Sequence, residues 1–183
     1  MVLAGGIYAF VVRPSLNKKD ETTSSSQSSQ KSFRLPSDLK SKTSEEQNAL
    51  SIIDLSRRND ATTIINTYLN KAKLAQSEAD FIALINSYST TADGESVELI
   101  EKKIGKVDFA STGESSAIAE TTSEFDAASL IYKSGYFGHT NNIYLKINLY
   151  KPDPTVDSWK MYIFEFKAGD NESPLKADTQ VPI

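Results

Sequence analysis

Side chains that commonly carry catalysis are few in this sequence. It has one histidine, His139, and no cysteine. A cysteine nucleophile, a thiolate metal site, a disulfide and a lipid-modified N-terminal cysteine are therefore excluded, as are histidine-rich metal sites and relays between two histidines. His139 lies in the stretch Gly138–Asn142, which has the composition of a turn. We interpret it as a turn residue rather than a general base.

Carboxylate pairs are the remaining candidates for acid–base chemistry. Glu45 with Glu46, and Asp108 with Glu120, could form the two-carboxylate site of a hydrolase. No apolar surroundings that would raise the pKa of one carboxyl group are evident, so we interpret these residues as a solvated acidic surface. Leu3–Gly6 lacks the lysine of a phosphate-binding loop, and no Gly-x-Ser-x-Gly motif is present. We expect no catalytic residues, no cofactor and no metal.

Charge divides the chain into two parts. Residues 1–43 hold seven of the 20 basic and three of the 24 acidic side chains, which leaves the remainder with a net charge of −8. Nucleic-acid-binding proteins use clustered Lys and Arg to neutralise phosphates, so the acidic part is not expected to bind nucleic acid directly. The basic part could lie against anionic lipid head groups.

The N-terminal segment is apolar and is followed by a polar stretch. Residues 1–14 begin with twelve apolar and glycine residues, MVLAGGIYAFVV, which as a helix would reach about 18 Å of a hydrocarbon core of about 30 Å. We predict a membrane anchor; a cleaved signal peptide, or a strand or helix that docks on the folded domain, are the alternatives. Residues 15–44 are rich in Ser, Thr and Gln and predict a disordered tether.

The folded domain, predicted over residues 45–170, begins with helical periodicity. A short helix is predicted around Leu50, Ile53 and Leu55. Residues 61–75 have apolar side chains at spacings of three and four, with Asn59 or Asp60 as N-cap. Two further helices are predicted from their apolar faces. The first follows a Ser77–Asp80 capping box and has the face Phe81, Leu84, Ile85 and Tyr88. The second has the face Val97, Ile100 and Ile104 and is ended by Gly105.

The second half of the domain alternates with a period of two, which is typical of strands. We predict strands at residues 107–112, 116–122, 128–136, 143–150 and 159–167, and a polar tail at residues 171–183. The fold class is therefore α+β, with N-terminal helices packed on a curved antiparallel sheet of about four strands.

Aromatic residues concentrate in these strands, with ten of the chain's 17 between Phe125 and Phe166. In the last strand, strict alternation places Trp159, Met161 and Ile163 on one face and Tyr162, Phe164 and Phe166 on the other. A two-layer domain with one hydrated sheet face does not need apolar residues on both. Either both sets belong to the core, or Tyr162, Phe164 and Phe166 form an interface with a partner chain.

The layout of anchor, tether, helices and curved antiparallel sheet resembles the VirB-eight-like assembly proteins of type IV secretion systems. It is most similar to the TraH-type transfer proteins of Gram-positive conjugative plasmids. The resemblance implies a nuclear-transport-factor-two-like soluble domain in a non-enzymatic scaffold that contacts other subunits of a DNA-transfer channel and can self-associate. In place of the Asn-Pro-x-Gly motif of Gram-negative members the chain has Lys151–Pro154 and Ser173–Leu175, so no site residues are transferred.

Two functional alternatives stay open. One is a small-molecule-binding or enzymatic member of the same cone-shaped fold, with Asp126 or Tyr132 inside the cavity. The other is a different surface-tethered adaptor. Arg13, Lys18 and Lys19 follow the apolar segment and favour a cytoplasmic domain by the positive-inside rule. The resemblance and the tether favour a single-pass membrane protein with its domain on the outer, cell-wall side, which is our prediction.

Overall fold

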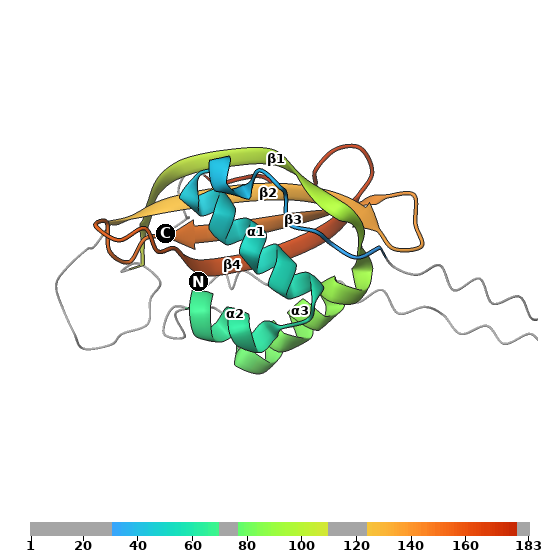
Figure 1. The fold of residues 1–183 in the computed structure, drawn as a ribbon, viewed down its shortest axis with the longest axis horizontal. Coiled ribbons are helices and arrows are strands. Elements are labelled where there is room, and N and C mark those ends of the chain that lie inside the picture. Colours follow the sequence, from blue (N-terminus) through green and yellow to red (C-terminus); the bar gives the residue numbers. More distant parts are fainter. Residues whose placement is uncertain (1–30, 70–76, 110–123, 179–183) are drawn as a thin grey trace, which may run out of the picture.

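The computed structural model describes residues 31–69, 77–109 and 124–178 (Figure 1). Several sequence predictions lie outside these residues: the anchor, the tether up to residue 30, the end of the second helix, the strand at 116–122, and the last five residues of the tail. Among the described residues, no helix is long and apolar enough to cross a membrane.

Three α-helices precede the sheet, and their starts agree with the capping signals in the sequence. They are α1 (Ser44–Arg57), α2 (Ala61–Tyr68) and α3 (Glu78–Thr91), with a short 3-10 helix, η1 (Leu39–Ser41), before them. The Asp60 carboxylate accepts the N–H of Thr63 at 3.1 Å, and Ser77 Oγ accepts the N–H of Asp80 at 3.1 Å. These bonds satisfy N–H groups that a helix leaves unpaired in its first turn.

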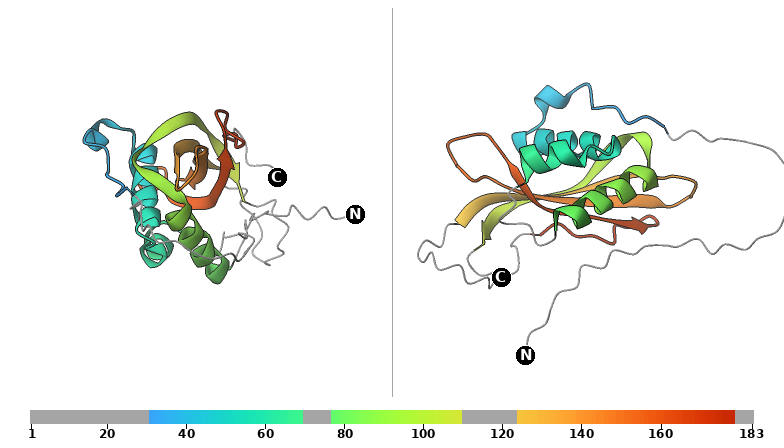
Figure 2. Two further views of the ribbon diagram at one scale, coloured as in Figure 1. Left: turned by 90° about the vertical axis from the view of Figure 1, so that its right-hand side faces the viewer. Right: turned by 90° about the horizontal axis from the view of Figure 1, so that it is seen from below.

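Four antiparallel strands follow in the spatial order β1-β2-β3-β4. They are β1 (Ala92–Asp108), β2 (Glu124–Tyr136), β3 (Asn142–Tyr150) and β4 (Lys160–Gly169). The sheet is strongly curved, and all three helices lie on one side of it (Figure 2). The predicted α+β class is confirmed, with three helices and a four-stranded antiparallel sheet.

The helical prediction for Val97, Ile100 and Ile104 is wrong, because this segment lies in β1. It pairs with β2 from Ala92 to Asp108, with an irregularity between Leu99 and Glu101 that leaves Ile100 without a direct partner. Val107 and Asp108, the first residues of the predicted strand 107–112, form the end of β1. Cross-strand pairing with β2 outweighs the helical spacing of three apolar residues.

The main hydrophobic core lies between the helices and one face of the sheet. Its largest wholly buried members include Phe81 and Tyr88 from α3 and Ile52 and Ile53 from α1. From the sheet it takes alternate residues of β3, namely Ile143, Leu145, Ile147 and Leu149. This alternation was predicted, and it identifies the helix-facing side of the sheet.

A C-terminal strap, Asp170–Asp178, lies across the opposite face, which we call the far face (Figure 2). Leu175 and Ala177 are buried there against Ile131 and Tyr144. The sequence predicts a polar tail for these residues, and the structure differs because Leu175 and Ala177 pack against apolar side chains of the sheet. The strap therefore packs as part of the domain.

Part of the predicted tether also contacts the domain. The N–H of Arg34 donates to the carbonyl of Glu95 in β1 at 2.8 Å, and the N–H of Lys31 donates to the Asp93 carboxylate at 2.9 Å. Phe33 lies 5.7 Å from the Arg57 guanidinium, within cation–π distance. Residues 31–34 thus run along the start of β1.

Candidate functional site

A bulge in β4 determines where its aromatic side chains point. Ile163 pairs with Asn148, whereas the next residue of β3, Leu149, pairs with Met161, so Tyr162 is an extra residue in β4. An extra residue reverses the alternation of a strand. The prediction that Met161 and Phe164 point to opposite faces is therefore wrong.

Phe164 and Phe166 belong to the helix-facing side. Phe164 is 6% exposed and pairs with Ile147 of the main core. Its ring lies edge-on to Phe81 at 6.2 Å and to Tyr88 at 5.5 Å. Phe166 lies 5.3 Å from Tyr88. Of the three predicted interface residues, Tyr162 alone packs on the far face.

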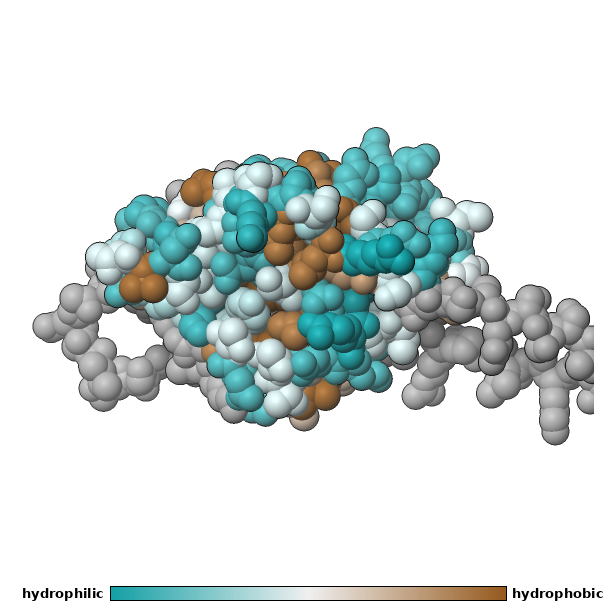
Figure 3. Space-filling view, in the orientation of Figure 1, coloured by the Kyte–Doolittle hydropathy of each residue, from teal (hydrophilic) through white to brown (hydrophobic). Residues whose placement is uncertain are grey.

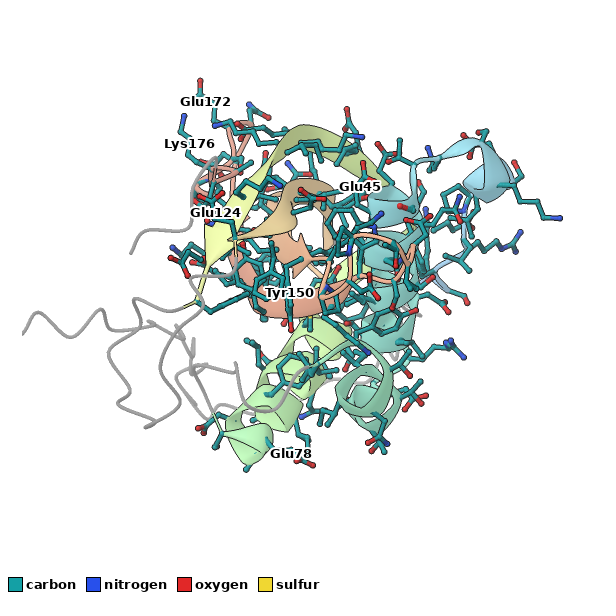
Figure 4. The ribbon with its side chains drawn as sticks, turned by 90° about the vertical axis from the view of Figure 1, so that its left-hand side faces the viewer. Glu45, Glu78, Glu124, Tyr150, Glu172 and Lys176 are labelled. Carbon is teal, nitrogen blue, oxygen red and sulfur yellow. The ribbon has the colours of Figure 1, made fainter. Side chains whose placement is uncertain are left out.

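Tyr162 joins a far-face aromatic cluster that also contains Phe109, Phe125 and Tyr150. Ring centroids are 4.9 Å apart for Phe109 and Tyr150, 5.4 Å for Phe109 and Tyr162, and 5.5 Å for Phe125 and Tyr150. The edge-to-face geometry is favourable for aromatic pairs. Tyr150, labelled in Figure 4, is the buried member of the cluster, and the rings of Phe109, Phe125 and Tyr162 are partly exposed.

The hydroxyl of Tyr162 stays protonated across the physiological range. Burial raises its pKa above the ordinary value of 10, and the nearby negative charge of Asp178 raises it further. The cluster therefore offers a neutral, largely apolar surface with a hydroxyl at its edge. Such amphipathic aromatic surfaces are common at protein interfaces.

A buried polar network holds the strap beside this cluster. Asp178 accepts hydrogen bonds from Lys146 Nζ at 2.5 Å and from Asn148 Nδ2 at 3.0 Å. Its N–H donates to Ser129 Oγ at 3.0 Å, and that hydroxyl donates to Asn148 Oδ1 at 2.7 Å. Since Ser129 and Asn148 are buried, the strap satisfies polar groups that the sheet would otherwise bury alone.

The strap is also tied to β1. The N–H of Ala177 donates to Glu101 at 3.0 Å, and Lys103 Nζ donates to the Ala177 carbonyl at 2.9 Å. The Ala177 hydrogen bond lowers the pKa of Glu101 below its ordinary value. Figure 4 shows Glu172 and Lys176 of the strap and Glu45 of α1 on opposite sides of the curled sheet.

The acidic pair Glu45 and Glu46 lies around a lysine rather than in a two-carboxylate site. Lys102 Nζ contacts Glu46 at 2.6 Å and Glu45 at 3.1 Å, and Thr43 Oγ1 donates to Glu45 at 2.6 Å. Burial alone would raise the pKa of Glu45, but hydrogen bonds from Thr43 and Lys102 outweigh it and lower the pKa. The hydrogen bond to Glu46 raises the pKa of Lys102. This arrangement is an ion-paired link between α1 and β1.

The structure does not bring together the polar residues considered for a ligand cavity. Asp126 is half-exposed and pairs with Lys106 at 2.5 Å, while Tyr132 lies six residues along β2, roughly 20 Å away at about 3.3 Å per residue. The Tyr132 hydroxyl is buried, without a hydrogen-bond partner among the described residues. Burial first, and then the charges of Glu46 and Glu45, raise the pKa of Tyr132.

The other candidate chemistry is also dispersed. His139 is exposed in the β2–β3 turn, where its ring centroid lies 4.0 Å from that of Tyr136. Its backbone N–H donates to the Tyr136 carbonyl. Asp108 ends β1, and its proposed partner Glu120 lies outside the described residues. Within residues 31–69, 77–109 and 124–178, no group of three His, Asp or Glu side chains could hold a metal ion.

Two features of the far face escaped sequence analysis. The bulge at Tyr162 has no marker in the apolar run from Met161 to Phe164. The strap has only Leu175 and Ala177 as apolar signals. On the helix-covered side, apolar side chains appear as separate patches among polar ones (Figure 3).

Comparison of the chain with models of known protein families, with curated proteins and with solved structures found no match.

Proposed function

We propose that this protein is a non-enzymatic, membrane-tethered scaffold subunit of a conjugative type IV secretion channel. Its soluble domain, of nuclear-transport-factor-two-like fold, lies on the outer side of the membrane and acts through contacts with other channel subunits. The N-terminal apolar segment supplies the anchor in this proposal.

The observation that carries the proposal is the far-face aromatic cluster. A two-layer α+β domain has its core on the helix-facing side, and the other face of an antiparallel sheet is usually polar. Here Tyr162, Phe109 and Phe125 remain partly exposed on that other face. Exposed aromatic groups of this kind suit a protein partner, because aromatic side chains dominate the energy of many interfaces.

The element order adds support. Three consecutive helices on one side, followed by a four-stranded antiparallel meander, is the layout expected from the resemblance to VirB-eight-like proteins. Fold alone does not define function, so the aromatic cluster and not the layout is the feature to test.

The test is plasmid transfer by donor cells that carry variants of the gene. Deleting the gene should abolish transfer of the element that encodes it. Tyr162→Ala should reduce transfer at unchanged protein level, because a partly exposed aromatic ring can contribute strongly to an interface. Tyr162→Phe, which keeps the ring, is the matched control and should restore transfer. Normal transfer after deletion of the gene would refute the proposal.

A further inference from the structure

The outer edge of β1 is a long unpaired strand edge. β1 is the first strand in the sheet order and bonds to β2 on one side. Residues 31–34 accompany only its start, through the hydrogen bond to Glu95. Among the described residues, no strand pairs with the other edge from Val97 to Lys106. Its backbone groups are therefore available for pairing with another strand.

This edge also carries exposed apolar side chains among its charged ones, which is unusual for a strand exposed to water. Leu99 is 37% exposed, Ile100 is 42% exposed and Ile104 is 58% exposed. Leu99 and Ile104 pair with Tyr132 and Ala128, whose side chains belong to the main core, so both point to the helix-facing side. Exposed apolar residues along an open edge favour strand addition.

Charge along β1 changes sign halfway. The acidic side chains Asp93, Glu95, Glu98 and Glu101 come first and the basic Lys102, Lys103 and Lys106 follow, with one acidic residue, Asp108, at the end of the strand. An antiparallel neighbour of the same sequence places each acidic half opposite a basic half, whereas a parallel neighbour places like charges together. The pattern is thus complementary to itself in one orientation.

We propose that two copies of this chain pair through their β1 edges, antiparallel about Lys102. The inference deepens the proposed scaffold function, on which it rests, by naming a second copy as the partner. In this register Glu101 faces Lys103 of the second copy. Leu99 and Ile100 together oppose one residue of β2 in their own chain, and in this register they face Ile104 of the second copy. The two sheets become one continuous eight-stranded sheet.

The centre of this pairing brings two Lys102 side chains near each other without an uncompensated charge. Each Lys102 is already held by Glu45 and Glu46 of its own chain, at 3.1 and 2.6 Å. The intrachain contact of Lys103 with Glu101, at 3.1 Å, involves partly exposed groups. Both side chains also bond Ala177 of the strap, but a carboxylate accepts several hydrogen bonds and an ammonium group donates three, so each can also face a partner on a second copy. The existing ion pairs are therefore compatible with a second strand at this edge.

Engineered cysteines test the register, because the chain has none of its own. Full-length Ile100→Cys and Ile104→Cys proteins, each with a different tag, are mixed in mild detergent and oxidised. The mixture should give a disulfide-linked heterodimer several-fold more abundant than either homodimer, because directly opposed residues of antiparallel strands have disulfide-compatible spacing. Val156→Cys, exposed in the β3–β4 loop, is the control for random collision. A heterodimer yield no higher than that of the control would overturn the proposal.

Substitution of the edge gives an independent measure. Ile104→Lys should raise the dimer dissociation constant about tenfold or more, because the side chain occurs twice in the symmetric interface. Ile82→Lys, on the exposed side of α3, should leave dimerisation unchanged. Sedimentation equilibrium provides the dissociation constants, and thermal melting checks that both variants fold. A wild-type chain that is monomeric throughout would refute β1 pairing, yet loss of transfer with Tyr162→Ala would still support the scaffold function.

Discussion

The two faces of the sheet are held by different physical means. On the helix-facing side, three helices cover a continuous core in which many side chains are wholly buried. The far face has two small apolar groups, one formed by the strap with the sheet and the other by the aromatic cluster. A buried polar network lies between them. The first face owes its stability to buried area, and the second depends on a few specific contacts.

The bulge at Tyr162 is the point where the two faces exchange residues. Without it, Met161 and Phe164 could not both reach the helix-facing core. With it, one aromatic side chain is released to the far face while its neighbours stay inside. A single extra residue therefore decides which aromatic group is available to a partner.

Truncating an aromatic ring on each face should give the largest contrast. Phe164→Ala should lower the free energy of unfolding by about 3–5 kcal/mol, because it removes a buried ring and leaves a cavity. Tyr162→Ala should lower it by about 1–2 kcal/mol, since its ring is only partly buried. Urea unfolding of both variants measures the difference. Equal losses would mean that the far face is as much a core as the helix-facing side.

Removing the carboxylate that holds the strap on the sheet should have an intermediate effect on the free energy of unfolding. Asp178→Ala leaves Lys146 and the Asn148 amide without their shared acceptor, and should cost about 1–3 kcal/mol of unfolding free energy. Asp157→Ala is the matched control, because its carboxylate pairs with Lys151 at 3.0 Å but is 64% exposed. That control should leave the free energy of unfolding nearly unchanged. If the two variants behave alike in chemical unfolding, the strap does not stabilise the far face.

The smallest expected effect concerns the link between α1 and β1. Lys102→Met should cost about 1 kcal/mol at neutral pH by removing the contacts with Glu45 and Glu46. Folding lowers the pKa of Glu45 below its ordinary value of 4.5. Glu45 therefore contributes to folding stability above pH 4.5, and this contribution is lost as the pH falls through the pKa of the folded state. The pKa of Lys102 is raised, so its contribution is present below 10.5 and is lost as pH rises through the folded value.

The stability difference between wild type and Lys102→Met should therefore be constant at intermediate pH and shrink in acid and in strong base. Thermal melting at pH 3, 7 and 11 is sufficient to detect this. A difference that stays the same at pH 3 would show that the carboxylates do not hold Lys102. Lys167→Met is the control and should change stability little, because Lys167 and its partner Glu165, at 2.8 Å, lie on the surface of β4.

Local patterns were sufficient for the elements that have strong local signals. The Ser77–Asp80 capping box marks the start of α3, and the alternation from Ile143 to Leu149 identifies both β3 and its helix-facing side. The prediction failed at residues 97–105, where helical spacing coincided with a strand. The exposed Ile100 and Ile104 supply that spacing, so it does not report a buried helical face.

By itself the sequence determined the α+β class, the three helices and the last three strands, because capping and periodicity act over a few residues. Which aromatic residue reaches the far face, and that residues 170–178 cover part of it, were decided only in the tertiary structure. Both depend on registers between segments distant in the chain: Met161 against Leu149, and Asp178 against Lys146. A one-residue change in register moves a side chain to the other face at no local cost, so no local pattern records it.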